Sequence, residues 1–280
     1  MIKEKAHAKI NLFLDILGKR LDNFHDLEMI MVSLKLHDTL TFTKRSDDKI
    51  VLHSDKTITE NVEDNLIYKI IRHMLDAYLI EKGVDVHIEK RIPIAAGLAG
   101  GSADAAATLR GVNRLFNLKL SLDQLAEIGV TFGADIPFCV HNRLCIARGK
   151  GEDLFFLKRN LKMPVLLVTP QIEVSTKRVF DHVDMDKVEN VKITTMTNAI
   201  YNKNYELLVR NVHNALEPFS FELFPEIKKL KDSLKTEGAD AVIMSGSGPT
   251  LVVFDKDTHR LKDLADKYRE THTVHLTKTL

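Results

Sequence analysis

The 280-residue chain has only two cysteines, Cys139 and Cys145, which are too few for a disulfide framework and match no four-ligand zinc spacing. We expect two reduced, partly buried thiols. Charge of one sign is also missing: 40 Lys+Arg against 39 Asp+Glu leaves a formal net charge of +1. The chain therefore has no overall electrostatic field that would attract nucleic acid or an acidic surface, and only a local basic patch would do so. A hydrophobic content of 44% excludes general disorder.

Long apolar runs are absent as well. No uncharged stretch approaches the ~18 apolar residues of a membrane helix. Lys3, Glu4, Lys5, His7 and Lys9 interrupt the first ten residues, where a signal peptide would need an apolar run. We therefore expect a cytoplasmic protein, monomeric or homodimeric, with a small-molecule substrate and neither a membrane nor a nucleic-acid partner.

The hydrophobic periodicity alternates between strand and helix types without a strict βαβα order, which predicts a two-domain α+β protein. A polar stretch at 158–163 suggests domains at 1–160 and 161–280. Among the expected elements are a strand pair at 29–36 and 39–43, a hairpin of strands at 136–140 and 144–147, and a helix at 198–209.

Residues 93–104, PIAAGLAGGSAD, form a glycine-rich loop between a predicted strand and a predicted helix. Gly97, Gly100 and Gly101 let the backbone approach an anion, and the helix start adds unpaired N–H groups and a positive dipole end. Ser102 would cap the helix, touch phosphate or hold a metal ion. The spacing fits neither a Walker loop nor a Rossmann fingerprint. The loop therefore predicts either a phosphate site or a tight turn built for close packing.

A second cluster, SGSGPT at 245–250, lies between two predicted strands and exceeds the two residues that a hairpin needs. Its glycine and hydroxyl content indicates a backbone that approaches a ligand, and a flexible hairpin is the alternative. One such cluster in each predicted domain favours a ligand bound between the domains.

Two charged side chains lie among apolar neighbours, Lys9 in AKINLFL and Asp135 in FGADIPF. A buried charge needs a partner or a function. If the two meet, a carboxylate base is placed beside a cation, which suits phosphoryl transfer. The alternatives are a structural ion pair or a loop cap. The competing carboxylates are Asp15, Asp104, Glu127 and Glu152.

The tetrad at 23–26, NFHD, places Phe24 beside His25. An aromatic ring and an imidazole together are able to stack on a base and to bond its edge. The alternative is a core phenylalanine with a surface histidine. No HExxH occurs among the 12 histidines, so we expect no protein-bound metal constellation.

Three segments, AKINLFL, PIAAGLAGGSADAA and MSGSGPTLVVF, resemble the three motifs of the GHMP kinases, which phosphorylate small alcohols such as galactose, homoserine and mevalonate. NFHDLEMIM, GADIPFCV and ARGKGEDL resemble segments of the branch that phosphorylates a cytidylated methylerythritol alcohol in non-mevalonate isoprenoid synthesis. The likeness runs in order over nearly the whole chain. It implies a ribosomal protein S5 domain 2-like N-terminal domain, a ferredoxin-like C-terminal domain, and ATP with Mg²⁺ as cosubstrate.

The resemblance also implies roles for matching residues. Asp135 would accept the proton of the substrate hydroxyl, Lys9 would orient it, and Asn11 would support Lys9 or the substrate. Asn65 would lie near the adenine. The ATP phosphates would be wrapped by Pro93, Ile94, Ala95, Ala96, Gly97, Leu98, Ala99, Gly100, Gly101, Ser102 and Ala103.

For the cytidylated substrate, the resemblance implies that Phe24 stacks on cytosine while His25 bonds its edge. Phe180, in VSTKRVF, would supply the second face of the stack. A stacked base contributes ~1–3 kcal/mol per aromatic side chain.

Several positions depart from the family pattern, whose loop reads near GGGLGGGSSDAA. Ala95, Ala96 and Ala99 stand where glycines are usual, and Ala103 stands in place of a serine. Alanine strains the loop wherever a positive φ is needed. We expect a competent kinase for the cytidylated alcohol. The alternatives are a GHMP kinase for another small alcohol and a weakly catalytic nucleotide-binding homologue.

Overall fold

The computed structural model describes residues 1–56 and 61–280, and the chain forms two units. The first unit contains residues 1–8, 36–94 and 99–142, and the second contains residues 9–35, 95–98 and 143–280. The units are interleaved in sequence because the long strands β1 (Ile2–Lys19) and β2 (His25–Lys44) each contribute to both. The predicted domains at 1–160 and 161–280 are contiguous segments, and their boundary stays a prediction.

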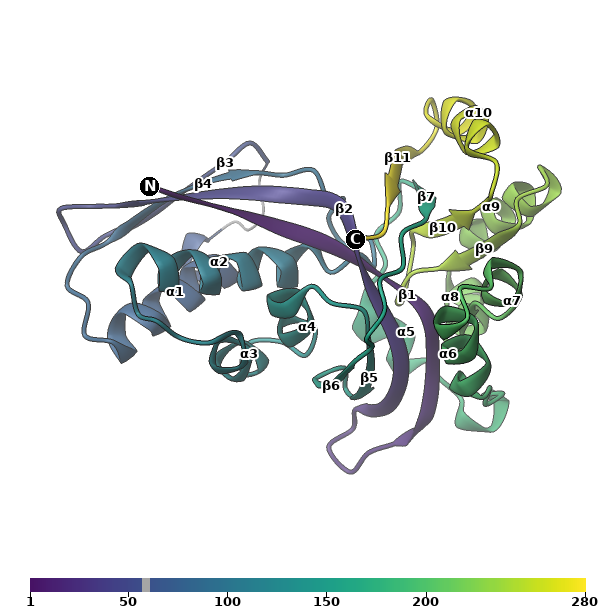
Figure 1. The fold of residues 1–280 in the computed structure, drawn as a ribbon, viewed down its shortest axis with the longest axis horizontal. Coiled ribbons are helices and arrows are strands. Elements are labelled where there is room, and N and C mark those ends of the chain that lie inside the picture. Colours follow the sequence, from purple (N-terminus) through teal and green to yellow (C-terminus); the bar gives the residue numbers. More distant parts are fainter. Residues whose placement is uncertain (57–60) are drawn as a thin grey trace. The chain divides into compact units, whose positions relative to one another are not determined.

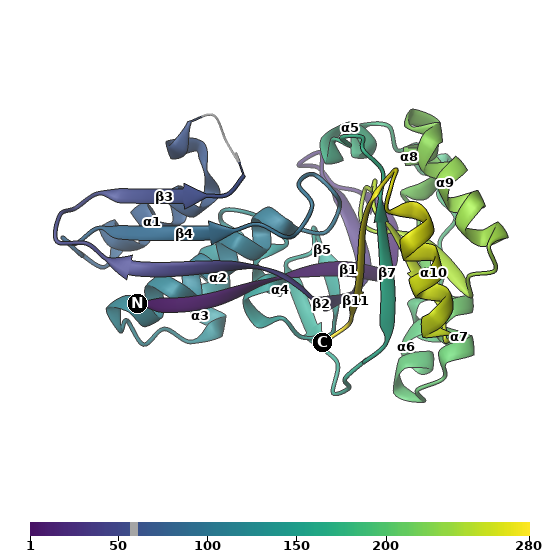
Figure 2. The same ribbon diagram turned by 90° about the horizontal axis from the view of Figure 1, so that it is seen from above.

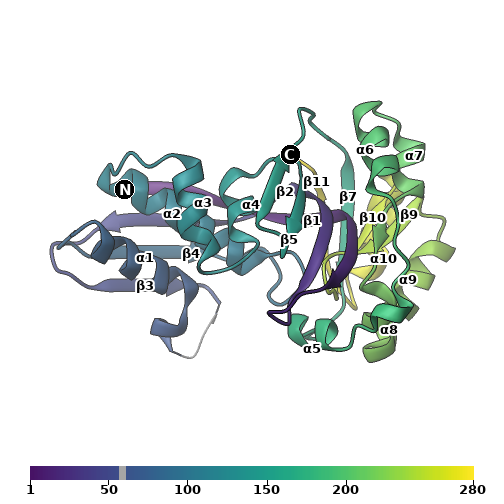
Figure 3. The same ribbon diagram turned by 90° about the horizontal axis from the view of Figure 1, so that it is seen from below.

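The first unit is a layer of strands covered on one face by helices (Figures 1 and 3). Strand β3 (Ile50–Ser54) pairs in parallel with β4 (Val84–Glu89), and β4 pairs antiparallel with the end of β2 from Thr39 to Lys44. The helices are α1 (Leu66–Ala77), α2 (Gly100–Phe116), α3 (Leu122–Val130) and α4 (Ile136–His141), with a short 3₁₀ helix at Val62–Asp64.

Alternation along β4 decides which of its residues face the helices. Val84, Val86 and Ile88 are buried, while the residues between them lie on the opposite face of the sheet. Helix α2 approaches β2 so closely that a Cβ atom on Gly111 would lie 2.4 Å from the Phe42 ring. Glycine at 111 therefore sets the distance between the helix and the sheet.

The second unit contains the rest of the strands. Strand β5 (Cys145–Gly149) pairs antiparallel with β2 from Leu27 to Met31 and with β6 (Asp153–Phe156). The two-residue strand β8 (His213–Asn214) runs parallel to β1. A separate antiparallel sheet has the order β11-β7-β10-β9. Its strands are β7 (Pro164–Thr169), β9 (Ala241–Met244), β10 (Leu251–Phe254) and β11 (Thr273–Lys278).

Helices α9 (Pro225–Thr236) and α10 (Thr258–Tyr268) lie on one face of this four-stranded sheet, as Figure 2 shows. Each is amphipathic, with Leu230 and Leu234 buried in α9 and with Leu261 and Leu264 buried in α10. The other helices of the unit are α5 (Thr176–Asp181), α6 (Ile193–Tyr201), α7 (Tyr205–Arg210) and α8 (Glu217–Leu223), with a 3₁₀ helix at Met185–Lys187.

The mixed architecture with two sheets confirms the expected α+β class. Three element predictions are wrong. Residues 136–140 form helix α4 rather than a strand, β2 runs without a break through 35–38, and residues 198–209 contain parts of two helices. Five consecutive apolar positions suit either a buried strand or a buried helix, and Pro137 in the first helical turn favours the helix.

Both cysteines are buried thiols outside any disulfide, and burial raises the pKa of the Cys145 thiol to about 12. No helix among the described residues combines the length and the apolar character needed to cross a membrane.

Candidate active site

Lys9 is held in place by two hydrogen bonds within the second unit. Its ammonium donates to the Asn11 side-chain oxygen at 2.9 Å, and its backbone N–H donates to the Leu98 carbonyl at 3.1 Å. Lys9 is only 5% exposed and Asn11 is fully buried. The Asn11 amide nitrogen donates in turn to the Met29 sulfur at 3.3 Å. The structure therefore brings together the lysine and the asparagine that the family motif pairs.

The two glycine clusters meet beside this lysine. The Ser245 hydroxyl donates to the Gly97 carbonyl at 2.9 Å, and a Cβ atom on Gly246 would lie 3.8 Å from the Lys9 ammonium. Gly97 has φ +71°, and a Cβ atom there would lie 2.2 Å from the Ser245 carbonyl oxygen. Only glycine fits that approach. Residues 95–98 and 245–248 thus form one backbone-lined surface around a buried ammonium.

Asn214, at the end of β8, holds the second cluster in shape. Its amide nitrogen donates to the carbonyl oxygens of Met244 at 2.7 Å and Gly246 at 2.8 Å. Its oxygen accepts the Leu216 N–H at 2.9 Å. Sequence analysis missed this residue because an asparagine between His213 and Ala215 matches no motif spacing.

Helix α2 begins at Gly100, so Ser102 lies inside it. Ala99 is the N-cap, with φ +55°, and its methyl side chain provides no capping hydrogen bond. The predicted capping role of Ser102 is therefore wrong, because this residue already lies in the first turn of the helix. Its hydroxyl stays a predicted ligand for phosphate or for the metal that accompanies it. The unpaired N–H groups at the helix start suit an anion.

The alanines that replace family glycines differ in their backbone conformation. Ala95 has φ +51° and Ala99 has φ +55°, whereas Ala96 is not in the left-handed region. An L-residue in that region costs ~1–2 kcal/mol. The strain that we expected wherever alanine replaces a glycine with positive φ is therefore present at positions 95 and 99.

We expect Ala99→Gly to raise the free energy of unfolding by ~1 kcal/mol, because it removes the left-handed strain at the helix start. The matched change Ala96→Gly should lower it by ~1 kcal/mol or more, since it adds freedom to the unfolded chain and removes a buried methyl group. Equilibrium denaturation with urea measures both. A loss of stability in both variants would contradict the strain argument.

A buried charge cluster lies against the start of α2 in the first unit. The Lys90 ammonium donates to the carboxylates of Asp38 at 2.5 Å and Asp104 at 2.6 Å. The other Asp38 oxygen accepts the N–H groups of Arg91 at 2.5 Å and Ile92 at 2.8 Å. Lys90 thereby ties the end of β4 and the strand residue Asp38 to α2.

The cluster is short of positive charge, because one ammonium faces two carboxylates. Burial raises the pKa of Asp104 to about 7. Burial lowers the pKa of Lys90, but Asp104 and Asp38 outweigh that effect and leave it raised. A Cβ atom on Gly100 would lie 3.8 Å from the Lys90 ammonium, so the cluster directly supports the loop-to-helix junction.

Sequence analysis missed Lys90 and Asp38, although Lys90 carried a signal. It occupies the next inward position after Val84, Val86 and Ile88, where a lysine must be paired.

Asp135 lies in the first unit, directly before α4, and is partly buried. Its side chain makes no capping hydrogen bond to helix α4. Asp135 follows helix α3 and precedes helix α4 rather than a strand. Lys9 belongs to the second unit, so the pairing of Lys9 with Asp135 stays a prediction.

Three of the competing carboxylates have structural roles. Asp15 accepts N–H groups from Ile16 and Val191, Asp104 pairs with Lys90, and Glu152 accepts the Lys150 N–H. The fourth, Glu127, is exposed on α3. These local roles do not decide the function of Asp135, which stays the predicted base.

The predicted cytosine-binding residues gather in the second unit. The His25 and Phe180 rings are stacked, with centroids 5.4 Å apart and planes 29° apart. Phe24 is 57% exposed, and the Lys150 ammonium lies 4.7 Å from its ring centre. The alternative of a core phenylalanine with a surface histidine is reversed here, because His25 is the buried member of the pair and Phe24 the exposed one.

Burial and the nearby Lys19 lower the pKa of His25, so its ring is neutral at pH 7. A neutral imidazole offers one donor and one acceptor, a pair of groups suited to the edge of a base.

Asn65 has a clear local role in the first unit. Its side-chain oxygen accepts the Ile67 N–H at 2.9 Å and caps helix α1. The position near adenine that the family resemblance implies stays a prediction.

Comparison with known proteins shows to which family the chain belongs. The GHMP kinases N terminal domain matches residues 65–143, and the GHMP kinases C terminal domain matches residues 196–273. A Staphylococcus haemolyticus protein is 45% identical over 251 residues, covering 90% of this chain and 89% of its own. A Staphylococcus epidermidis protein is 44% identical over 264 residues, covering 94% of both chains. One solved structure matches with a TM-score of 0.85 and 28% identity over 99% of both chains.

The chain therefore belongs to the GHMP kinase family, as its three motifs indicated. The two-domain GHMP kinase fold expected from those motifs is confirmed. The two staphylococcal relatives carry the provisional name 4-diphosphocytidyl-2-C-methyl-D-erythritol kinase. The solved structure is that of a 4-(cytidine 5'-diphospho)-2C-methyl-D-erythritol kinase.

Proposed function

We propose that this chain transfers the terminal phosphoryl group of Mg²⁺·ATP to a hydroxyl of 4-diphosphocytidyl-2-C-methyl-D-erythritol, a step in isoprenoid precursor synthesis. Relatives at 44–45% identity over most of the chain support this assignment. The structural observation that carries the choice of substrate is the stacked His25–Phe180 pair with exposed Phe24 next to it in the chain.

In this proposal Asp135 accepts the proton of the attacking hydroxyl. General-base catalysis of this kind contributes ~10²–10⁴-fold to the rate. Lys9, which Asn11 holds in a fixed orientation, supplies the positive charge that keeps the base ionised and directed at the hydroxyl. Positioning and electrostatic stabilisation supply the rest of the acceleration.

The phosphates of ATP are proposed to lie along residues 93–103. Gly97 permits this loop to lie close against the Ser245 backbone, and the N–H groups at the start of α2 face the negative charge of the phosphates. The Ser102 hydroxyl, in the first turn, is the proposed contact to phosphate or to its Mg²⁺. Asn65 is proposed to border the adenine.

The cytidine end of the substrate is proposed to bind at Phe24, His25 and Phe180. The base stacks on an aromatic face, and the neutral His25 ring bonds its edge. Cytosine presents an amino donor beside ring acceptors, which complements the donor and the acceptor of a neutral imidazole.

An ATP-consumption assay with the cytidylated alcohol, mevalonate, homoserine and galactose side by side tests the substrate. We expect turnover with the cytidylated alcohol alone. Preferred turnover of another alcohol would assign a different GHMP kinase activity, and nucleotide binding without turnover would leave a weakly catalytic homologue.

Phe24→Ala is expected to raise KM for the cytidylated substrate ~5- to 150-fold, because one stacking face worth ~1–3 kcal/mol is lost. KM for ATP should not change. Steady-state kinetics with each substrate varied in turn provides the measurement.

Phe155→Ala is the matched control, because Phe155 is also an exposed phenylalanine with a cation near its ring, in this case Arg148 at 5.5 Å. An unchanged KM in Phe24→Ala, or an equal rise in both variants, would contradict the assignment of Phe24 to the base.

A further inference from the structure

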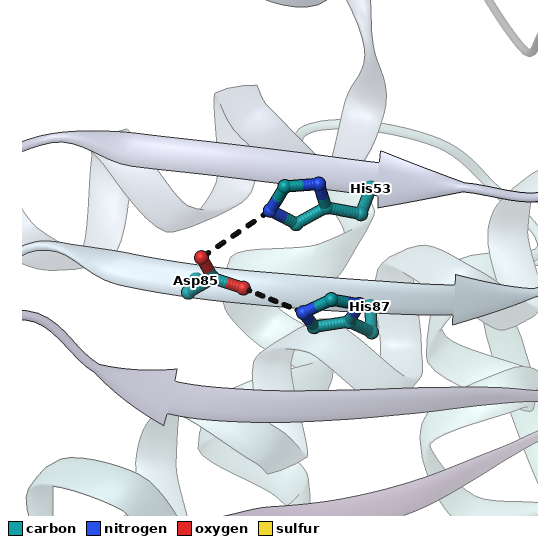
Figure 4. Close-up of side chains that lie close together, drawn as sticks. All are labelled: His53, Asp85 and His87. Carbon is teal, nitrogen blue, oxygen red and sulfur yellow. Dashed lines mark hydrogen bonds and ion pairs between the residues drawn. The ribbon is translucent and has the colours of Figure 1, made fainter.

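A histidine-rich cluster lies on the face of the first unit's sheet that is opposite the helices. In the parallel register of β3 and β4, His53 lies directly across from His87. Asp85 is two residues before His87 on the same strand and therefore points to the same face. Strand geometry alone thus gathers two imidazoles and one carboxylate at one position (Figure 4).

The candidate ligand atoms of these three residues lie close enough together to contact one ion. The Nε2 atom of His53 lies 3.3 Å from one Asp85 oxygen, and the Nε2 atom of His87 lies 3.1 Å from the other. Ligands bound to tetrahedral zinc at ~2.0–2.2 Å are separated by ~3.2–3.6 Å. All three ligand atoms lie within 4.8 Å of one another, and Figure 4 shows both Nε2 atoms directed at the carboxylate.

The hydrogen bonding around Asp85 is incomplete. Its Oδ1 atom is buried and makes no hydrogen bond with any described residue, although the His87 Nε2 atom is only 3.1 Å away. A cation bound beside Oδ1 would supply the partner that this buried oxygen lacks.

Neighbouring cations leave room for a further positive charge. The Arg45 guanidinium lies 3.5 Å from a carboxylate oxygen of Asp85. Its guanidinium is already engaged by Asp47 in two shorter bonds, at 2.6 and 2.8 Å. The side chains of His53 and His87 are 51% and 63% exposed, so an ion and a water ligand have access from solvent.

We propose that His53, Asp85 and His87 form a surface site for one divalent transition-metal ion, Zn²⁺ in the first place, that links β3 to β4. Two imidazoles and one carboxylate form a donor set typical of zinc, and water completes the tetrahedron. The site is separate from the residues proposed for phosphoryl transfer. Mg²⁺ does not compete for it, because that ion prefers an oxygen-only environment.

Isothermal titration calorimetry of the full, metal-stripped chain with Zn²⁺, in excess Mg²⁺, tests the proposal. We expect one Zn²⁺ per chain, bound in the micromolar range, and affinity at least ~tenfold weaker in His53→Ala, His87→Ala or Asp85→Asn. Titration with Co²⁺ should produce the visible absorption of a tetrahedral complex in the wild type and not in His87→Ala. Zn²⁺ should also raise the Tm of the wild type, which reports on the link between the strands.

His182→Ala is the control, because His182 forms a histidine–carboxylate pair with Glu222 at 3.0 Å, with no third ligand among the residues that the structure describes. It should bind Zn²⁺ like the wild type. Circular dichroism of each variant confirms that the fold is retained. Absence of stoichiometric binding in the wild type, unchanged affinity in all three cluster variants, or an equal loss in His182→Ala would overturn the site.

Discussion

Asp135→Asn is expected to lower kcat by about 10²–10⁴-fold while leaving the affinity for ATP nearly unchanged. Asparagine keeps the shape of the side chain but cannot accept a proton from the attacking hydroxyl. The loss should therefore appear in the chemical step and not in the binding of the nucleotide. Single-turnover phosphoryl transfer measures the first quantity, and fluorescence titration with a nucleotide measures the second.

Glu127→Gln is the matched control for this variant. Glu127 is an exposed carboxylate on α3, a few residues before Asp135 in the chain, and its neutralisation should leave kcat unchanged. Phosphoryl transfer at the wild-type rate in Asp135→Asn would reject Asp135 as the base. Loss of nucleotide binding together with turnover would instead point to a structural role.

Lys90→Ala should lower the free energy of unfolding by about 3–5 kcal/mol, because it leaves the carboxylates of Asp38 and Asp104 buried without their ammonium. The side chains of Lys90 and Asp38 are 4% and 0% exposed, so water cannot solvate the carboxylates in place of the ammonium. Equilibrium denaturation of the purified variant gives the value. Because the cluster supports the start of α2, ATP affinity should fall as well.

The adjacent residue provides the control, since Arg91 is 63% exposed and its ion pair with Glu89 is 3.8 Å long. Arg91→Ala should cost less than ~1 kcal/mol. Asp104→Asn should cost less than Lys90→Ala, because it leaves one ammonium to pair with one carboxylate. If the Lys90 and Arg91 variants lost equal stability, the charge cluster would not be the stabilising element that its burial indicates.

Several local elements were predictable because their signals are contained in short segments. The alternation of Val84, Val86 and Ile88 is typical of a half-buried strand such as β4, and the Ser121–Gln124 pair is the sequence signature of the capping box that begins α3. The sequence predicted strain wherever a replaced glycine needs a positive φ, and only the backbone shows that this holds at Ala95 and Ala99. In each case the determining contacts lie within a few residues along the chain.

Other elements were misread because local patterns do not distinguish the alternatives. Residues 136–140 are apolar on all sides, so helix and strand periodicity are equally satisfied. The polar stretch at 35–38 resembles a turn, yet β2 continues through it, and Asp38 there binds Lys90, 52 residues further along the chain.

The sequence by itself determined the family, the glycine-rich segments and the inward and outward faces of most strands, because motif spacing and side-chain alternation are properties of neighbouring residues. The tertiary structure decided which distant residues share a surface. It stacked His25 on Phe180, set Lys9 between two glycine clusters, and placed His53 beside His87. Such juxtapositions depend on strand register and on how closely elements pack. Neither quantity can be predicted from the residues of a single segment.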